Sequence, residues 1–141
     1  MIYKQYQVVV VPFPFSEKFY SKKRPAVVLT DEVYNSSHTN LILAMITTSK
    51  TSWQSDLKLT DLDISGLLKP CSVRFKIFTL PQSLIDRNLG VLGSFDQKSL
   101  KVQLKKSFKS LQVFNLVKTT LMHFGFAKIL LLLGRQKKPS I

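Results

Sequence analysis

Two polar groups border apolar segments of the kind that form buried strands. Arg24 ends a run of three cations just before Pro25 and the apolar segment AVVLT (26–30), and the hydroxyl-rich segment TTSKTS (47–52) follows the apolar segment LILAMI (41–46). Arginine offers paired donors to a phosphate, and hydroxyls donate to a phosphoryl oxygen as charge builds up in a transition state. If the two strands are neighbours, both groups lie at one rim of a small barrel. Because no metal ligands accompany them, this combination suits a phosphodiester substrate.

Other familiar chemistries lack their usual residues. The sequence contains no GxGxxG, GxxxxGK[ST], HExxH or GxSxG motif, so the usual anchors for nucleotide binding, zinc proteolysis and serine hydrolysis are missing. His38 and His123 are far apart in the chain, and Cys71 has no histidine near it in the sequence, so we expect none of the three to act in catalysis. No Cys/His set has the spacing of zinc ligands. We therefore expect no metal and no cofactor.

The apolar segments predict a single, mainly β domain. QVVVVPF (7–13) is rich in β-branched residues, and AVVLT and LILAMI have the composition of buried strands. SDLKLTDLD (55–63) and SVRFKIF (72–78) alternate between apolar and polar residues, which predicts two more strands, the second half exposed. On that second strand, Val73, Phe75 and Ile77 would share one face, and Arg74, Lys76 and Phe78 the other. Five strands separated by loops predict a small barrel or a strongly bent sheet.

A helix is expected after the strands. Leu100, Leu104, Phe108 and Leu111 recur at helical spacing, and Asp96 is a suitable N-cap. The expected fold class is therefore mainly β with a C-terminal helix. With one cysteine and no segment of the signal-peptide type near the N-terminus, the simplest expected location is the cytoplasm.

The charge of the chain is concentrated near its C-terminus. The formal net charge is +13, yet all eight acidic residues precede position 97, and ten of the 21 Lys and Arg residues follow it. We expect a domain over 1–108 and a basic, apolar extension over 109–141. Polar residues interrupt this extension too often for a bilayer span, so we expect no transmembrane helix. A membrane is not an expected partner. The extension is compatible with an amphipathic helix on an anionic membrane, with packing on a partner, or with a terminal stretch outside the selected domain.

These segments resemble the MazF/PemK family of toxins, the ribonuclease partners in toxin–antitoxin pairs. The resemblance covers about residues 3 to 108 and rests on VPFPFS, KKRPAVVLT, MITTS and SGLLKPCSVRFKIFTL. RPAVVL followed about twenty residues later by ITTS is a fairly specific pair. Toxins of this family usually have Gly-Asp just before the first strand, where this chain has Tyr6 and Gln7.

The resemblance implies a small SH3-like barrel that forms a homodimer, binds a cognate antitoxin and cuts single-stranded RNA without a metal. The family's catalytic arginine and threonine map onto Arg24 and Thr47. In such cleavage the ribose 2′-OH attacks phosphorus and leaves a 2′,3′-cyclic phosphate, so the substrate supplies the nucleophile. Arg24 would stabilise the phosphorane and take part in proton transfer. The further residues expected to contact RNA are Lys22, Lys23, Thr48, Ser49, Arg74 and Lys76. Aromatic residues that could stack on unpaired bases are Phe15, Phe19, Tyr20 and Trp53.

Two other functions remain open on the residues alone. A small barrel of this type could bind RNA, DNA or a protein through the same basic rim without cutting anything, because a fold does not determine a function. It could also be an inactive toxin relic that still folds and binds an antitoxin.

The first prediction concerns the extension. Truncation after Phe108 should leave a folded domain with its chemistry intact, because the expected strands, the site residues and most of the expected helix precede that point. The loss of the basic extension should weaken binding to a polyanion most strongly at low salt. Circular dichroism and salt titrations of binding would check both effects. A truncated chain that fails to fold would show that the extension belongs to the core.

Overall fold

The computed structural model describes residues 1–13 and 22–108. Phe15, Phe19, Tyr20, Leu111 and the predicted extension 109–141 lie outside the described residues. The chain divides into two compact units, 1–103 and 104–141. The elements in chain order are β1 (Gln7–Phe13), β2 (Lys22–Val28), α1 (Glu32–Ser37), β3 (Asn40–Thr47), β4 (Leu57–Lys58), α2 (Leu62–Ser65), β5 (Ser72–Pro81), the 3-10 turn η1 (Gln82–Leu84), β6 (Arg87–Val91) and α3 (Ser94–Ser107).

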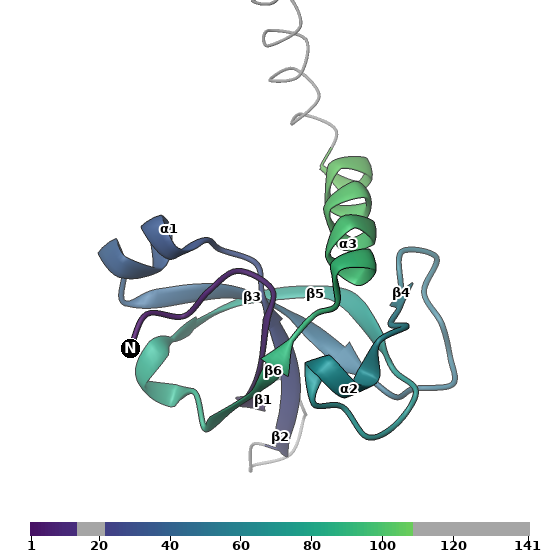
Figure 1. Cartoon of the computed structure of the whole chain (residues 1–141), viewed down its shortest axis with the longest axis horizontal. Coiled ribbons are helices and arrows are strands. Elements are labelled where there is room, and N and C mark those ends of the chain that lie inside the picture. The colour runs from purple at the N-terminus through teal and green to yellow at the C-terminus, as the bar shows by residue number, and fades with distance from the viewer. Residues whose placement is uncertain (14–21, 109–141) are drawn as a thin grey trace, which may run out of the picture. The chain divides into compact units, whose positions relative to one another are not determined.

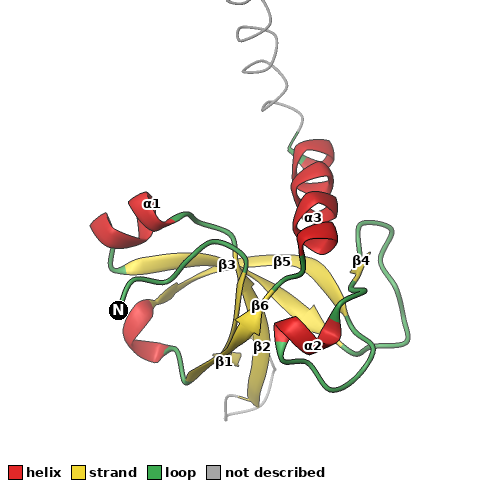
Figure 2. Ribbon diagram, in the orientation of Figure 1, coloured by secondary structure: helices red, strands yellow, loops and turns green. Residues whose placement is uncertain are grey.

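The strands form one antiparallel sheet in the order β4-β5-β3-β2-β1-β6 (Figure 1). Two register shifts interrupt it, one between Val8 and Val9 where β1 pairs with β6, and one between Ala44 and Met45 where β3 pairs with β5. Such irregularities bend a strand and increase its twist, so the sheet curls into a half-closed barrel. The prediction of a mainly β fold with a C-terminal helix is confirmed. Figure 2 shows how short the helices are apart from α3.

Apolar side chains are buried on both faces of the sheet. Successive residues of a strand point to opposite faces, so the four valines of β1 contribute to both. One face, here called the core face, carries the main hydrophobic cluster, which consists of Val9, Val11, Phe13, Ala26, Val28, Leu41, Leu43, Met45, Phe78 and Leu80. The opposite face, here called the pocket face, carries Val8, Val10, Val27, Ala44, Ile46 and Val73. The strongly apolar runs in the sequence are explained by this double burial.

Two local predictions are wrong, and two elements were not predicted. The alternating segment 55–63 forms only the two-residue strand β4, after which Asp61 caps α2 by accepting a hydrogen bond from the backbone N–H of Ile64. Asp96 is not an N-cap, because α3 begins at Ser94. Its carboxylate is 1% exposed and accepts hydrogen bonds from the backbone N–H groups of Thr60 and Asp61. The sequence analysis also missed α1 and β6.

The strand β5 is more buried than its alternation predicts. Val73 is fully buried on the pocket face and Phe78 is 7% exposed in the main cluster, so both faces carry buried residues, whereas Lys76 and Thr79 are exposed. The edge of Phe78 meets the ring of Phe13 with the centroids 4.9 Å apart. A partly polar strand is thus central to the sheet, between β3 and β4.

Tyr6 stands where toxins of the resembling family have glycine, and its backbone has the conformation that glycine favours. Its φ of 68° is the only positive value among the described residues other than glycine. The turn is held on both sides, since the N–H of Tyr6 donates to the carbonyl of Val28 and its own carbonyl accepts from the N–H of Leu92. Burial of the ring raises the pKa of the Tyr6 hydroxyl. A residue other than glycine therefore holds this turn in a left-handed conformation.

A buried ion pair fixes the loop between β3 and β4. The Nη2 atom of Arg74 lies 2.8 Å from Oδ2 of Asp56, and its Nε atom donates to Oδ1 of the same carboxylate at 3.1 Å. Both side chains are 8% exposed. The same Nη2 atom donates to the backbone carbonyl of Thr51 at 2.6 Å. The side-chain hydrogen bond from Arg74 lowers the pKa of Asp56, and the reciprocal bond raises the pKa of Arg74.

Removal of this carboxylate should destabilise the fold and change its response to acid. Asp56→Asn leaves the Arg74 guanidinium buried without a counter-charge, so the free energy of unfolding should fall by about 3 kcal/mol at pH 7. Because the folded pKa of Asp56 lies below its unfolded value of about 3.9, its stabilisation is present above that pH and is lost as the pH falls through the folded pKa. Urea denaturation between about pH 6 and pH 3 would measure this.

The exposed Asp63→Asn is the matched control, and its effect should stay within about 0.5 kcal/mol. Wild type should therefore lose more stability than Asp56→Asn over this acid range. If the free energies of unfolding of wild type and Asp56→Asn ran parallel over this pH range, the ion pair of Asp56 with Arg74 would contribute nothing to folding.

Candidate active site

Arg24 and Thr47 lie at the same end of neighbouring strands. β2 begins at Lys22 and β3 ends at Thr47, and their antiparallel register pairs Ala26 with Met45. When that register is extended by two residues along each strand, Arg24 comes to stand across from Thr47. Both residues are on the core face, because Arg24 pairs with buried Val11 and Thr47 is two residues beyond Met45. The structure thus brings the two predicted residues to the same end of two inner strands. This end of β2 and β3 is here called the edge.

The Thr47 side chain is held in place by the loop that follows it. Its Oγ1 atom accepts a hydrogen bond from the backbone N–H of Ser49 at 3.1 Å, and the residue is 6% exposed. Because this bond uses a lone pair, the hydroxyl proton stays free to donate to another acceptor. Ser49 is exposed, and its own hydroxyl lies 2.9 Å from that of Thr51. Of the predicted residues Thr47, Thr48 and Ser49, the structure links Thr47 and Ser49 at this strand end.

Lys22 shares the edge with Arg24, whereas Lys23 does not. Lys22 pairs with Phe13 and belongs to the core face, while Lys23 pairs with Pro12 and belongs to the pocket face. The ammonium of Lys23 lies 2.6 Å from Oδ1 of Asp86, and this hydrogen bond lowers the pKa of Asp86. Lys22 is exposed and adds positive charge beside Arg24.

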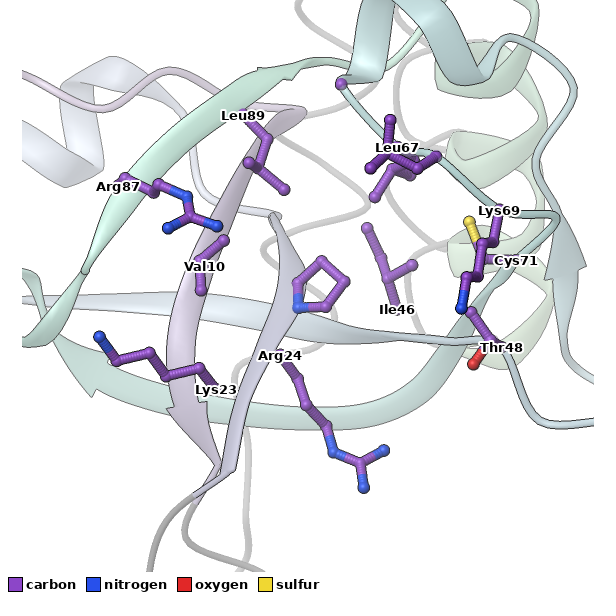
Figure 3. A pocket seen from close by; sticks show the side chains of 13 residues that line it. Val10, Lys23, Arg24, Ile46, Thr48, Leu67, Lys69, Cys71, Arg87 and Leu89 are labelled. Atoms are coloured by element: carbon purple, nitrogen blue, oxygen red, sulfur yellow. The ribbon is translucent and has the colours of Figure 1, made fainter.

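The pocket face carries a cavity of about 380 Å³ behind the candidate site. Its floor is apolar and its rim is cationic, with lining residues that include Val10, Ile46, Leu67, Leu89, Lys69 and Arg87. Thr48 lines this cavity, so its hydroxyl belongs to the pocket face and not to the edge with Thr47. Arg24 also lines this cavity, and in Figure 3 its guanidinium extends away from Ile46 and Leu67. The cavity and the candidate site therefore adjoin at Arg24.

Cys71 also lines this cavity, where its thiol is buried and not paired in a disulfide. The residue is 6% exposed, and burial, with a further contribution from the charge of Asp96, raises the pKa of the thiol to about 11. The thiolate is the nucleophilic form, and almost none is present at neutral pH. Among residues 1–13 and 22–108, no group of three or more His, Cys, Asp or Glu side chains could hold a metal ion.

Arg74 and Lys76, both expected to contact RNA, lie on β5 in different environments. Arg74 pairs with Met45 and faces the core side, but its guanidinium is taken up by Asp56 and the Thr51 carbonyl. Lys76 is exposed, and its ammonium lies 5.7 Å from the ring centroid of Trp53. No sequence pattern marks the ion pair of Arg74 with Asp56, because Asp56 is 18 positions away in a segment that alternates like a strand. Arg74 therefore shapes the loop beside Thr47, and Lys76 is available to a ligand.

No helix within the described ranges is long and apolar enough to cross a membrane.

Solved structures with this fold are toxins or endoribonucleases by their names. The Mycobacterium tuberculosis toxin MazF-mt6 is 23% identical, with 73% of this chain and 96% of that chain covered at a TM-score of 0.61. A crystal structure of MazF from Deinococcus radiodurans is 13% identical, with 77% and 98% covered at a TM-score of 0.62. A mycobacterial endoribonuclease in complex with its cognate antitoxin is 13% identical, with 77% and 94% covered at a TM-score of 0.58. At these identities the structures show a shared fold.

A comparison with models of protein families identifies the family. A separate search of curated proteins found no significant match to the chain. The family model described as "PemK-like, MazF-like toxin of type II toxin-antitoxin system" matches residues 4–108. That range contains every described strand and helix. The chain therefore belongs to the PemK-like, MazF-like family of type II toxins.

Proposed function

We propose that this chain is an endoribonuclease that cuts single-stranded RNA at the edge formed by Arg24 and Thr47. The observation that carries this proposal is the placement of the two side chains at one end of β2 and β3, on the same face. Family membership supports it, as does the endoribonuclease named among the structures that share the fold. A cytoplasmic location follows from an RNA substrate of this kind.

The chemistry assigns one task to each residue. The ribose 2′-OH gives its proton to a base and attacks the adjacent phosphorus. The bond to the 5′-oxygen breaks, an acid protonates that oxygen, and the product carries a 2′,3′-cyclic phosphate. Arg24 stabilises the extra negative charge on the phosphorane, because a guanidinium stays charged at neutral pH and donates two parallel hydrogen bonds. Thr47 donates its free hydroxyl proton to a phosphoryl oxygen. The substrate supplies the nucleophile, so the site needs neither a nucleophilic serine or cysteine nor a metal-bound hydroxide.

The cations around this edge guide the RNA backbone. Lys22 lies beside Arg24 on the core face, and Lys76 lies exposed on β5. Ser49 adds an exposed hydroxyl at the strand end. Lys23 and Thr48 belong to the pocket face, so within one protomer they can meet only a different part of the same strand.

The antitoxin is the second partner that we propose. One structure that shares the fold is named as an endoribonuclease in complex with its cognate antitoxin, and two more are named MazE-MazF. The cavity on the pocket face offers an apolar floor for an inserted side chain and cations for an acidic segment, with Lys23, Lys69 and Arg87 at its rim. A homodimer is proposed on the family resemblance alone, and residues 1–108 are proposed as the catalytic domain.

Single-turnover cleavage of an unstructured RNA tests the proposed function. Arg24→Ala should slow cleavage by on the order of 10²–10³-fold, the usual effect of removing one preorganised donor from a developing charge. Thr47→Val keeps the β-branched shape and removes only the hydroxyl, so it should slow cleavage by about 10–10²-fold. EDTA in excess should leave the wild-type rate unchanged, and DNA should not be cut because it lacks the 2′-OH.

Matched controls are available on the same fold. Lys101→Ala removes one exposed cation from α3, and Thr79→Val makes the same substitution on the exposed side of β5. Both controls should cut at the wild-type rate. Folded Arg24→Ala and Thr47→Val proteins that cut as fast as these controls would remove both residues from the site. A wild type that binds RNA without cutting it would favour the non-catalytic module.

A further inference from the structure

The loop after Thr47 is held rigidly although it contains no regular structure. It spans residues 48–56 between β3 and β4. At its start, the N–H of Ser49 donates to Thr47, and near its end Arg74 binds both the Thr51 carbonyl and the Asp56 carboxylate. A buried guanidinium with several partners orders a segment more firmly than exposed pairs do, because removing any partner leaves a charge without compensation. The loop therefore has one defined conformation next to the candidate site.

Trp53 is positioned by the same contacts. Its backbone N–H donates to Oδ2 of Asp56 at 2.9 Å, and its carbonyl accepts from the N–H of Asp56 at 3.0 Å. The Arg74 guanidinium carbon lies 4.8 Å from the centroid of the indole, and the Lys76 ammonium lies 5.7 Å from it. Both cations come from β5, so the strand supports the ring through cation–π contacts.

The ring is nevertheless exposed. Trp53 has 44% of its surface open to solvent, and it is not a member of the main hydrophobic cluster. A large aromatic side chain that is fixed in orientation and left open to water gains little from burial. What it offers is a flat apolar surface at a set angle. This combination is typical of a surface prepared for a flat ligand.

The position of the ring matches an RNA strand that passes Arg24 and Thr47. Arg24, Thr47 and Arg74 lie on three neighbouring strands, β2, β3 and β5, and all belong to the core face. Adjacent strands are about 5 Å apart, so β5 lies about 10 Å from β2 along the hydrogen-bonding direction. A nucleotide next to the scissile phosphate can therefore reach the loop above β5. Unpaired bases stack readily on aromatic side chains, and Lys76 would neutralise the neighbouring phosphate.

We propose that Trp53 is a base-stacking platform that holds an unpaired base flanking the scissile phosphate. The proposal rests on the proposed ribonuclease function and assigns a specific binding residue to it. The Arg74–Asp56 pair acts as a positioning device for the platform. Trp53 thus contributes to RNA affinity and to the placement of the strand, and it does not take part in the bond-breaking step.

The chain contains a single tryptophan, so its fluorescence reports on this one position. The probe is a set of unstructured 12-nucleotide RNAs with a 2′-O-methyl group on every ribose, which removes the nucleophile and prevents cleavage. Binding should quench the emission of Trp53. Replacing one nucleotide at a time with an abasic 2′-O-methyl residue should abolish the quenching at one position and leave it intact at the others. This arm uses the wild-type protein only.

The protein variants give the second arm. Trp53→Leu should weaken binding of the same RNAs by about 5- to 150-fold, measured by anisotropy of a labelled RNA, whereas Trp53→Phe should keep most of the affinity. With cleavable RNA, Trp53→Leu should raise KM and leave kcat within about twofold, unlike Arg24→Ala, because the bound substrate and the transition state lose the same binding energy. Phe95→Leu, at an aromatic residue of α3 that is even more exposed than Trp53, should change nothing.

The outcomes distinguish failure of the Trp53 proposal from failure of the proposed ribonuclease function. Quenching that is lost at one abasic position, together with weaker binding by Trp53→Leu, supports the platform. A wild type that cuts RNA but shows no quenching, or a Trp53→Leu protein with wild-type affinity, overturns the platform and leaves the ribonuclease standing. A wild type that neither binds nor cuts RNA overturns the proposed function and the platform with it.

Discussion

The antiparallel register of β1, β2 and β3 is the constraint on which the candidate site depends. It pairs Arg24 with Val11 and Ala26 with Met45, and so it sets which side chains share a face at the strand ends. A slip of one residue would turn Arg24 to the pocket face, away from Thr47. The burial of apolar side chains on both faces opposes such a slip, because it would rearrange both faces of the sheet. Pro25 adds to this by restricting the backbone of Arg24 to extended conformations.

The sheet uses its two faces for different tasks. On the core face, Arg24 and Thr47 lie at the edge of the main cluster, and the loop that follows is tied to Arg74 on β5. On the pocket face, an apolar cavity with a cationic rim lies behind the same edge. Because successive residues of a strand point to opposite faces, neighbouring residues at this edge can contact different ligands. In the proposed function, the core face would meet RNA and the pocket face would meet the antitoxin.

The sequence predicted the strands that are apolar and failed where burial comes from polar contacts. QVVVVPF, AVVLT and LILAMI all lie in or overlap described strands, since β-branched runs have few other uses. Arg74 looked like a free cation, because nothing in the sequence marks Asp56 as its partner across a loop. Asp96 looked like a cap, yet it binds the backbone of a distant segment. Tyr6 carries a turn that composition assigns to glycine. The sequence could place Arg24 and Thr47 at strand ends because a proline and a hydroxyl-rich segment mark those positions, and their catalytic roles stay a prediction.

The central claim is that Arg24 and Thr47 act on the same phosphate, and a double-mutant cycle of the cleavage rate tests it most directly. Residues that stabilise one transition state together have non-additive effects when both are removed. The single-turnover rate of the folded double variant Arg24→Ala/Thr47→Val should therefore be close to that of Arg24→Ala alone. A double variant whose loss equals the product of the two single losses would contradict a shared site, as would single variants with no loss at all.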